Sequence, residues 1–208
     1  MVTEQQAARL PDHYGDIDDI GIDGTGHREL FVSLLEGACC PAWSRDGRRI
    51  AFTAAEETHS GSLWVMKANG DDPHGIAVSP EGLAYTLPTW SRRSVWLAFS
   101  YVIEPTNGYS TGFIGLVKAT GKGPIHRIKA GIDPWQPDWS RDGRKIVFSE
   151  RHQTIKVLDV RTRKVRALAE GQDPSWSPNG RKIVFTCELI DICVMNANGS
   201  HVVRATHR

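Results

Sequence analysis

The chain has 208 residues, of which 40% are hydrophobic and 24% are charged, which is typical of a folded globular domain and too apolar for a disordered segment. Lys and Arg number 25 against 24 Asp and Glu, so the net charge of +1 lacks the basic excess of general nucleic-acid-binding proteins. No apolar run approaches the roughly 18 residues needed to cross a bilayer. Twenty glycines and seven tryptophans favour short strands, tight turns and large aromatic packing residues.

The charge is unevenly distributed along the chain. Residues 1–36 contain eight acidic and two basic side chains, a net charge of −6, so the remaining residues carry +7. We hypothesise that this acidic start and the basic end, with Arg204 and Arg208, attract each other within one chain or head to tail between two chains. The first residues lack the apolar segment of a secretory signal. This favours a cytoplasmic protein, or a fragment that has lost its leader.

The four cysteines give little information on their state. Cys39 and Cys40 are adjacent, and Cys187 and Cys193 are six positions apart. Four cysteines allow three pairings, among which the sequence does not choose. No Cys-x-x-Cys and no Cys/His spacing typical of zinc sites is present. We expect reduced or simply buried thiols.

The first predicted elements are two strands over Ile17–Ile22 and His27–Val32, joined by a turn at Asp23-Gly24. They match the third and fourth strands of the repeated unit that follows them in the chain. The first two strands of such a unit are missing before them. We therefore predict half a unit over residues 17–36, preceded by a polar N-terminal extension over residues 1–16.

A twelve-residue pattern then recurs four times without gaps. Its tryptophans are spaced 47, 49 and 37 residues apart, close to the period of about 40–50 residues for one four-stranded propeller blade. Because these tryptophans recur in every unit, we interpret them as packing anchors. The segments are PAWSRDGRRIAF with Trp43, PTWSRRSVWLAF with Trp90, PDWSRDGRKIVF with Trp139 and PSWSPNGRKIVF with Trp176.

Each copy of the pattern predicts two strands joined by a turn. The Pro-x-Trp-Ser stretch is expected to be extended, because proline fixes its own φ and biases the preceding residue towards extended geometry. In the Ser-x-Asp-Gly turn, glycine supplies a positive φ. The Ile-x-Phe stretch is apolar on consecutive residues, which indicates a strand buried on both faces. In the second copy Arg93-Ser94 replaces Asp-Gly, so we expect an altered hairpin there.

A second hairpin follows in each unit. Leu63–Met66 leads to Ala68-Asn69-Gly70, and Ile192–Met195 leads to Ala197-Asn198-Gly199; Asn-Gly is a strong hairpin signal. The strand after each turn is polar, as an exposed outer edge should be. We place the full blades at about 37–83, 84–130, 131–170 and 171–208.

The repeated PxWSxDGxxIxF followed by an (L/I)xVMxAxG hairpin resembles the WD-like propeller repeats of the TolB family, over about residues 17–206. The resemblance implies an all-β propeller of four-stranded blades. With four full blades and an N-terminal half blade, where the family's propellers are usually six-bladed, we predict an open or incomplete ring.

The same resemblance implies a function. TolB is a periplasmic component of the bacterial envelope-spanning Tol–Pal system, so a non-catalytic, protein-binding scaffold is predicted, with no cofactor, no nucleic acid and no membrane insertion. Its location would then be periplasmic. Self-association through incomplete blade edges is a further expectation. Two alternatives stay open: the propeller of a larger serine peptidase or hydrolase, and a sugar- or metal-binding propeller enzyme.

One sequence motif suggests catalysis, but its context does not. Residues 108–112 match GxSxG around Ser110, the nucleophile elbow of serine hydrolases, which needs an apolar strand before it and a helix after it. Pro105 interrupts the preceding stretch, and a predicted strand follows. We expect no catalytic role for Ser110.

Two surfaces are candidates for binding. The connection between the second and third strands is longest in the second blade, and long loops on rigid scaffolds often bind partners; its candidate residues are Tyr101, Tyr109 and Phe113. The connections entering the inner strands form the second candidate, a rim at one end of the central channel. Converging carboxylates can bind a cation, but their spacing matches no calcium loop, so we predict no metal. The rim comprises Glu36, Asp133, Trp135, Asp138 and Asp173.

Overall fold

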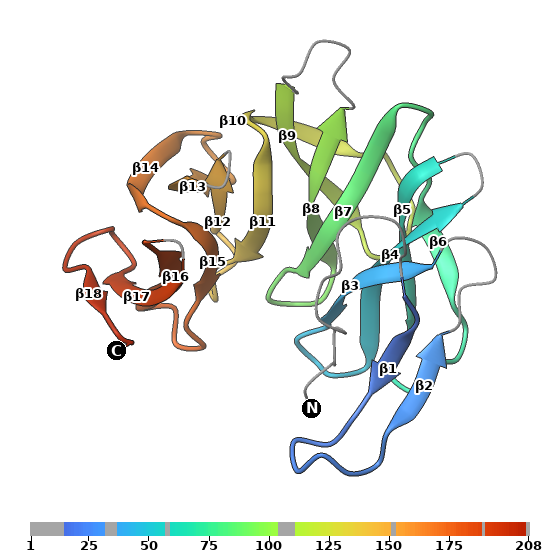
Figure 1. The fold of residues 1–208 in the computed structure, drawn as a ribbon. Helices are drawn as coiled ribbons and strands as arrows, with labels where there is room; N and C mark the ends of the chain where they lie inside the picture. The colour runs from blue at the N-terminus through green and yellow to red at the C-terminus, as the bar shows by residue number, and fades with distance from the viewer. Residues whose placement is uncertain are drawn as a thin grey trace.

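The computed structural model describes residues 15–31, 37–56, 59–103, 111–150, 153–188 and 190–206. Every regular element in these ranges is a strand. One two-stranded sheet and four four-stranded antiparallel sheets follow each other along the chain, each sheet a simple up-and-down meander. The sheets are arranged around an open arc (Figure 1). The prediction of an incomplete propeller with half a blade at its N-terminal end is confirmed.

The strands of each sheet have the following bounds. The half blade consists of β1 (Ile17–Asp19) and β2 (Arg28–Phe31). The first blade consists of β3 (Ala38–Trp43), β4 (Arg49–Glu56), β5 (His59–Lys67) and β6 (His74–Ala77), and the second of β7 (Leu83–Trp90), β8 (Trp96–Ile103), β9 (Thr111–Lys118) and β10 (His126–Ile132). The third consists of β11 (Pro134–Trp139), β12 (Lys145–Glu150), β13 (Thr154–Asp159) and β14 (Val165–Glu170), and the fourth of β15 (Gln172–Trp176), β16 (Lys182–Cys187), β17 (Asp191–Asn196) and β18 (Val203–Arg204).

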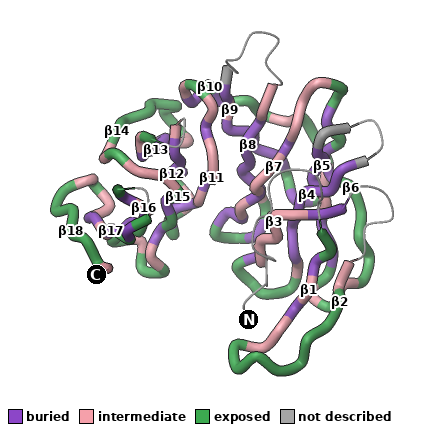
Figure 2. Tube along the Cα trace, viewed as in Figure 1, coloured by how far each residue is buried: buried purple, intermediate pink, exposed green. Residues whose placement is uncertain are grey.

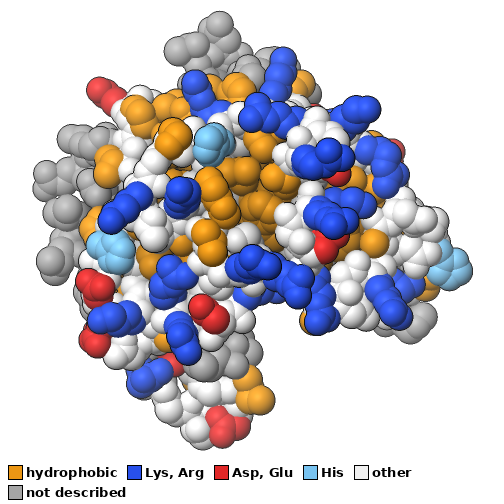
Figure 3. Space-filling view, turned by 180° about the vertical axis from the view of Figure 1, so that it is seen from behind, with side chains coloured by type: hydrophobic (Ala, Val, Ile, Leu, Met, Phe, Trp, Pro, Cys, Tyr) orange, Lys and Arg blue, Asp and Glu red, His pale blue; other side chains and the backbone are white. Residues whose placement is uncertain are grey.

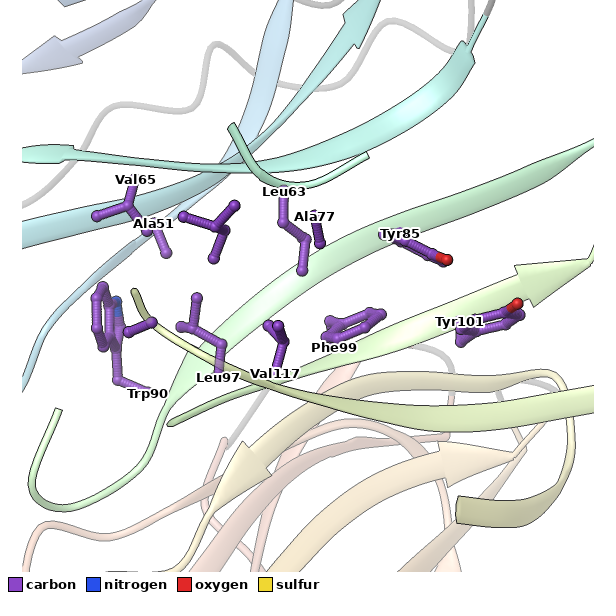
Figure 4. Close-up of a cluster of buried hydrophobic side chains, with 12 residues drawn as sticks. Ala51, Leu63, Val65, Ala77, Tyr85, Trp90, Leu97, Phe99, Tyr101 and Val117 are labelled. Carbon is purple, nitrogen blue, oxygen red and sulfur yellow. The ribbon is translucent and has the colours of Figure 1, made fainter. Parts of the chain in front are cut away.

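The hydrophobic core lies between the blades. Ala51, Leu63 and Val65 of the first blade face Leu97 and Phe99 of the second across one such interface (Figure 4). Burial is highest along the second and third strands of each blade, whereas outer strands such as β14 are largely exposed (Figure 2). The consecutive apolar residues of β4, β8 and β12 therefore serve two interfaces at once, as a strand covered on both faces requires.

Two of the four repeated tryptophans connect successive inner strands by a hydrogen bond. The indole Nε1–H of Trp90 donates to the carbonyl of Ala42 in the preceding blade at 2.8 Å, and that of Trp176 donates to the carbonyl of Asp138 at 3.1 Å. Trp43 follows the half blade, which lacks inner strands. Its side chain is only partly buried. The buried Nε1 of Trp43 has no acceptor among the described residues, and neither has that of Trp139 in the third blade.

The turn of the second blade differs from its prediction. The N–H of Ser94 donates to the carbonyl of Ser91 at 2.9 Å, as that of Gly47 does to Ser44 in the first blade. Ser94 adopts a φ of 53°, close to the 68° of Gly47. The expected change in this hairpin is therefore wrong, because a serine occupies the left-handed position that glycine takes in the other blades.

The residue before each repeated proline is also not extended. The inner strand of every full blade contains a bulge at this point, seen as a shift in its register with the second strand. The bulge places one non-glycine residue per blade at positive φ, contrary to the bias that proline usually imposes. These residues are Cys40 at 59°, Leu87 at 56°, Gln136 at 48° and Asp173 at 53°.

The cysteines form two disulfides rather than the expected thiols. Cys39 is bonded to its neighbour Cys40 within the inner strand of the first blade. Cys187, at the end of β16, is bonded to Cys193 in β17. Both bonds lie within single blades, so they stabilise local structure and do not connect the two ends of the arc.

The two ends of the arc remain separate. A notch is open between the half blade and the last blade in the space-filling view (Figure 3). Arg204, expected to attract the acidic start of the chain, instead pairs with Asp191 at 2.5 Å and Glu188 at 3.6 Å in its own blade. The hypothesis of an attraction between the ends of one chain is therefore not supported for this residue; Arg208 lies outside the described residues. The described part contains no helix with the length and apolarity needed for crossing a membrane.

Candidate functional site in the central channel

The inner strands of the four full blades surround the channel and contact each other in chain order, β3 with β7, β7 with β11 and β11 with β15. Where their bulges meet, they line an open cavity of about 370 Å³. All four blades contribute to its lining. The lining residues are Cys40, Pro41, Leu87, Pro88, Thr89, Gln136, Pro137, Asp138, Asp173, Pro174 and Ser175.

The bulge presents one side chain per blade at this cavity. The position before proline holds Cys40, Leu87, Gln136 or Asp173, so its chemistry varies while the backbone geometry repeats. The buried Oε1 of Gln136 accepts no hydrogen bond from the described residues. A rigid scaffold with variable side chains is a common arrangement for recognition, and backbone strain concentrates at such sites.

Asp138 links the blades to each other. One carboxylate oxygen accepts hydrogen bonds from the backbone N–H of Trp176 at 2.7 Å and from Ser175 Oγ at 3.0 Å, both in the fourth blade. The other accepts from Thr89 Oγ1 of the second blade at 3.3 Å and lies 3.5 Å from Nη2 of Arg45 in the first. Asp138 thus contacts all four blades, and its carboxylate is largely occupied in holding the channel together.

The remaining rim residues are dispersed. Asp173 is exposed and lines the cavity, but Asp133 and Trp135 are not among its lining residues, and Glu36 lies outside the described residues. The carbonyl of Trp135 accepts a hydrogen bond from Ser149 Oγ at 3.3 Å. Within the described ranges, no three His, Cys, Asp or Glu side chains gather in a way that could hold a metal ion.

The predicted partner loop is a packed aromatic cluster where it is described. Tyr101 is only 5% exposed. The centroid of its ring lies 4.9 Å from that of Tyr85 and 5.9 Å from that of Phe113. Burial raises the pKa of Tyr85 to about 12, and the electrostatic interaction and hydrogen bond with Tyr101 act in the same direction. Arg127 lies over both Tyr101 and Phe113. Tyr101 therefore lacks the exposure that a partner contact requires, and Tyr109 and Ser110 lie outside the described residues.

Sequence reasoning found Asp138 and Asp173 but missed Cys40, Leu87 and the reason that these positions converge. The signal was present in the sequence, since the position before each repeated proline is the variable one. This position could be recognised as part of a site only once the bulge was known. Proline usually favours an extended residue before it, so the sequence did not suggest a bulge there.

These features define the class of the protein as a β-propeller of four-stranded blades with an incomplete ring and a central channel lined by polar and apolar residues. A family model described as the TolB beta propeller domain matches residues 20–207. The chain therefore belongs to this family. No curated protein sequence matches it.

Solved structures with the same fold include proteins of different kinds. A putative TolB from Agrobacterium tumefaciens is 18% identical with a TM-score of 0.75, over 91% of this chain and 73% of that one. A puromycin-hydrolyzing peptidase of Mycobacterium tuberculosis is 15% identical with a TM-score of 0.66, over 91% of this chain but 32% of that one. An oligogalacturonate lyase from Vibrio parahaemolyticus is 13% identical with a TM-score of 0.58, over 91% of this chain and 53% of that one. At these identities the likeness concerns the fold.

Proposed function

We propose that the chain is a non-catalytic binding module whose channel cavity holds a short extended segment of a partner protein. The observation that carries this proposal is the presentation of four different side chains, Cys40, Leu87, Gln136 and Asp173, at one repeated backbone position around the cavity. Membership of the TolB propeller family supports a role in protein interaction.

The chemistry of the cavity suits a peptide. Leu87 and the proline rings supply apolar surface, while Thr89, Gln136 and Ser175 supply polar groups. Asp173 adds an exposed carboxylate that favours a basic or amide-bearing side chain. A cavity of about 370 Å³ accommodates a few side chains and not a folded domain.

The alternative function is a propeller within a larger peptidase or lyase. It rests on fold similarity to proteins at most 15% identical, and one fold hosts many functions. No specific contact among the described residues favours it over peptide binding.

Site-specific photocrosslinking tests the proposal. A photoreactive amino acid at position 87, inside the cavity, is compared with one at Val165, which is 37% exposed on the outer strand β14. We expect a discrete protein adduct from position 87 in cells of the source organism, absent at position 165 and weakened by Gln136→Ala. Adducts that are equal at both positions, or no protein adduct at position 87, would overturn peptide binding in the channel.

A further inference from the structure

Three arginines occupy one equivalent position in the inner turns of successive blades. Arg45, Arg92 and Arg141 each follow the serine of the Trp-Ser pair, and Pro178 takes this place in the fourth blade. All four residues line one cavity of about 290 Å³ at the inner turns. Trp139, Trp176 and Ser177 are its other lining residues. The four full blades therefore converge on this cavity as well.

Packing between the turns holds these arginines in place. A Cβ on Gly180 would lie 3.3 Å from the Cβ of Arg141, so the fourth turn packs directly on this side chain. Nη1 of Arg141 donates to the carbonyl of Pro178 at 3.2 Å. Nη2 of Arg45 reaches from the first blade to the carbonyl of Trp139 in the third, at 3.4 Å.

Negative charge near these arginines is scarce. Among the described residues, no carboxylate belongs to the lining of this cavity. Asp138 lies 3.5 Å from Arg45 but already accepts hydrogen bonds from the fourth blade. A second cavity of about 310 Å³ shares Arg92 and Arg141 and adds Lys145 and Asp142.

The single carboxylate of the second cavity is committed to its own turn. Asp142 accepts from Ser140 Oγ at 2.7 Å and from the N–H of Arg144 at 3.0 Å. Arg92 is exposed, and the described residues provide no carboxylate within ion-pair distance of it. Positive charge therefore exceeds negative charge at the turn end of the channel, although the whole chain carries a net charge of only +1.

We propose that Arg45, Arg92 and Arg141 form a binding site for a small oxyanion with two or more negative charges, in the cavity that the inner turns line. The guanidinium group presents a planar set of donors that matches the oxygens of phosphate and carboxylate groups. A cavity of about 290 Å³ has room for a small polyvalent anion. This site shares no lining residue with the peptide-binding cavity and does not require it to be occupied.

Isothermal titration calorimetry at low ionic strength tests the site with three probes. Pyrophosphate represents a phosphate source, citrate represents a polycarboxylate source, and acetate is the singly charged control. We expect saturable binding of pyrophosphate or citrate at one per chain, with an affinity that falls as salt is added, and no saturation by acetate. The stronger of the two polyvalent probes identifies the source of the oxyanion.

Removing one positive charge inside or outside the cavity distinguishes binding at this site from general attraction of the anion to a positively charged surface. Arg92→Gln should weaken binding at least about tenfold, which corresponds to about 1.4 kcal/mol. Arg161→Gln removes an equal charge from the exposed turn between β13 and β14 and should leave affinity unchanged. Arg45→Gln provides a second variant within the site, and thermal melting confirms folding of each. Equal binding by Arg92→Gln and Arg161→Gln, or no saturable binding by the unaltered chain, would overturn the proposal.

Discussion

The third and fourth blades carry the same Ile-Val-Phe segment, yet they bury it differently. Ile146 and Ile183 are both 0% exposed, whereas Val147 is 0% exposed and its counterpart Val184 is 37% exposed. Ile155 and Ile192 show the same contrast, 0% against 38%. One face of the blade is thus equally buried in both copies, and the other is not.

The difference arises from neighbours rather than from residue types. Val147 and Ile155 pack against a face of the fourth blade that includes Trp176, Ile183 and Phe185. No described residue covers the equivalent face of the fourth blade to the same degree. The repeat therefore encodes a strand with two apolar faces, and the presence of a neighbouring blade decides whether both are used.

The most severe test of this contrast introduces a charge at each valine. Val147→Asp would bury an unpaired carboxylate between two blades and should reduce the free energy of unfolding by about 4 kcal/mol or more. Val184→Asp places the same group where water reaches it and should cost less than about 1 kcal/mol. Chemical denaturation of both variants measures the two losses. Similar losses would mean that the outer face of the fourth blade is covered in solution.

A second test concerns the position just before the repeated tryptophan, Asp138 in the third blade and Ser175 in the fourth. Asp138→Asn weakens charge-assisted hydrogen bonds to the N–H of Trp176 and to Ser175, at an expected cost of about 1.5–3 kcal/mol. Asp173→Asn is the control, since Asp173 is exposed and its neutralisation should change stability by no more than about 0.5 kcal/mol. Equal effects in denaturant titrations would show that Asp138 does not connect the blades.

The repeat made the number and order of the blades predictable. The features that were missed are those formed where neighbouring blades meet. The spacing of Trp43, Trp90 and their equivalents predicted four blades because each blade must satisfy the same packing. The bulge before each proline was missed, because a local rule predicts extended backbone there, whereas the residue before each of these prolines has a positive φ. The arginines at the turns were missed as a group because only the closing of successive turns on one another brings them together.

The turns allow a smaller test of how far the blades are equivalent. Gly143 and Gly180 occupy the left-handed position in the third and fourth blades at φ values of 71° and 72°, and Ser94 does so in the second at 53°. Ser94→Gly removes a backbone cost of about 1–2 kcal/mol, and about 0.5–1 kcal/mol of this is lost to the greater freedom of glycine in the unfolded chain. A net gain of about 0.5 kcal/mol is expected in thermal melting. A destabilised variant would show that the second turn is held by contacts that the others lack.

The smallest expected effect is the response of two matching turns to acid. Burial alone would raise the pKa of Asp142, but hydrogen bonds from Ser140 Oγ and the N–H of Arg144 outweigh it and lower the pKa below its ordinary value of 3.8. Asn179 of the fourth blade accepts the same two bonds, from Ser177 Oγ at 2.8 Å and the N–H of Arg181 at 2.9 Å, without titrating.

Because the pKa of Asp142 is lower in the folded chain than in the unfolded chain, its stabilising contribution is complete above the unfolded value and is lost as the pH falls through the folded one. Asp142→Asn should therefore make melting less dependent on pH below about pH 4. The reverse exchange, Asn179→Asp, should make it more dependent. Melting temperatures measured across this interval, each relative to the unaltered chain, isolate the two turns from the other carboxylates. If both exchanges left the pH dependence of the melting temperature unchanged, the charge of Asp142 would not contribute to stability. The serine and backbone hydrogen bonds alone would then stabilise the two turns.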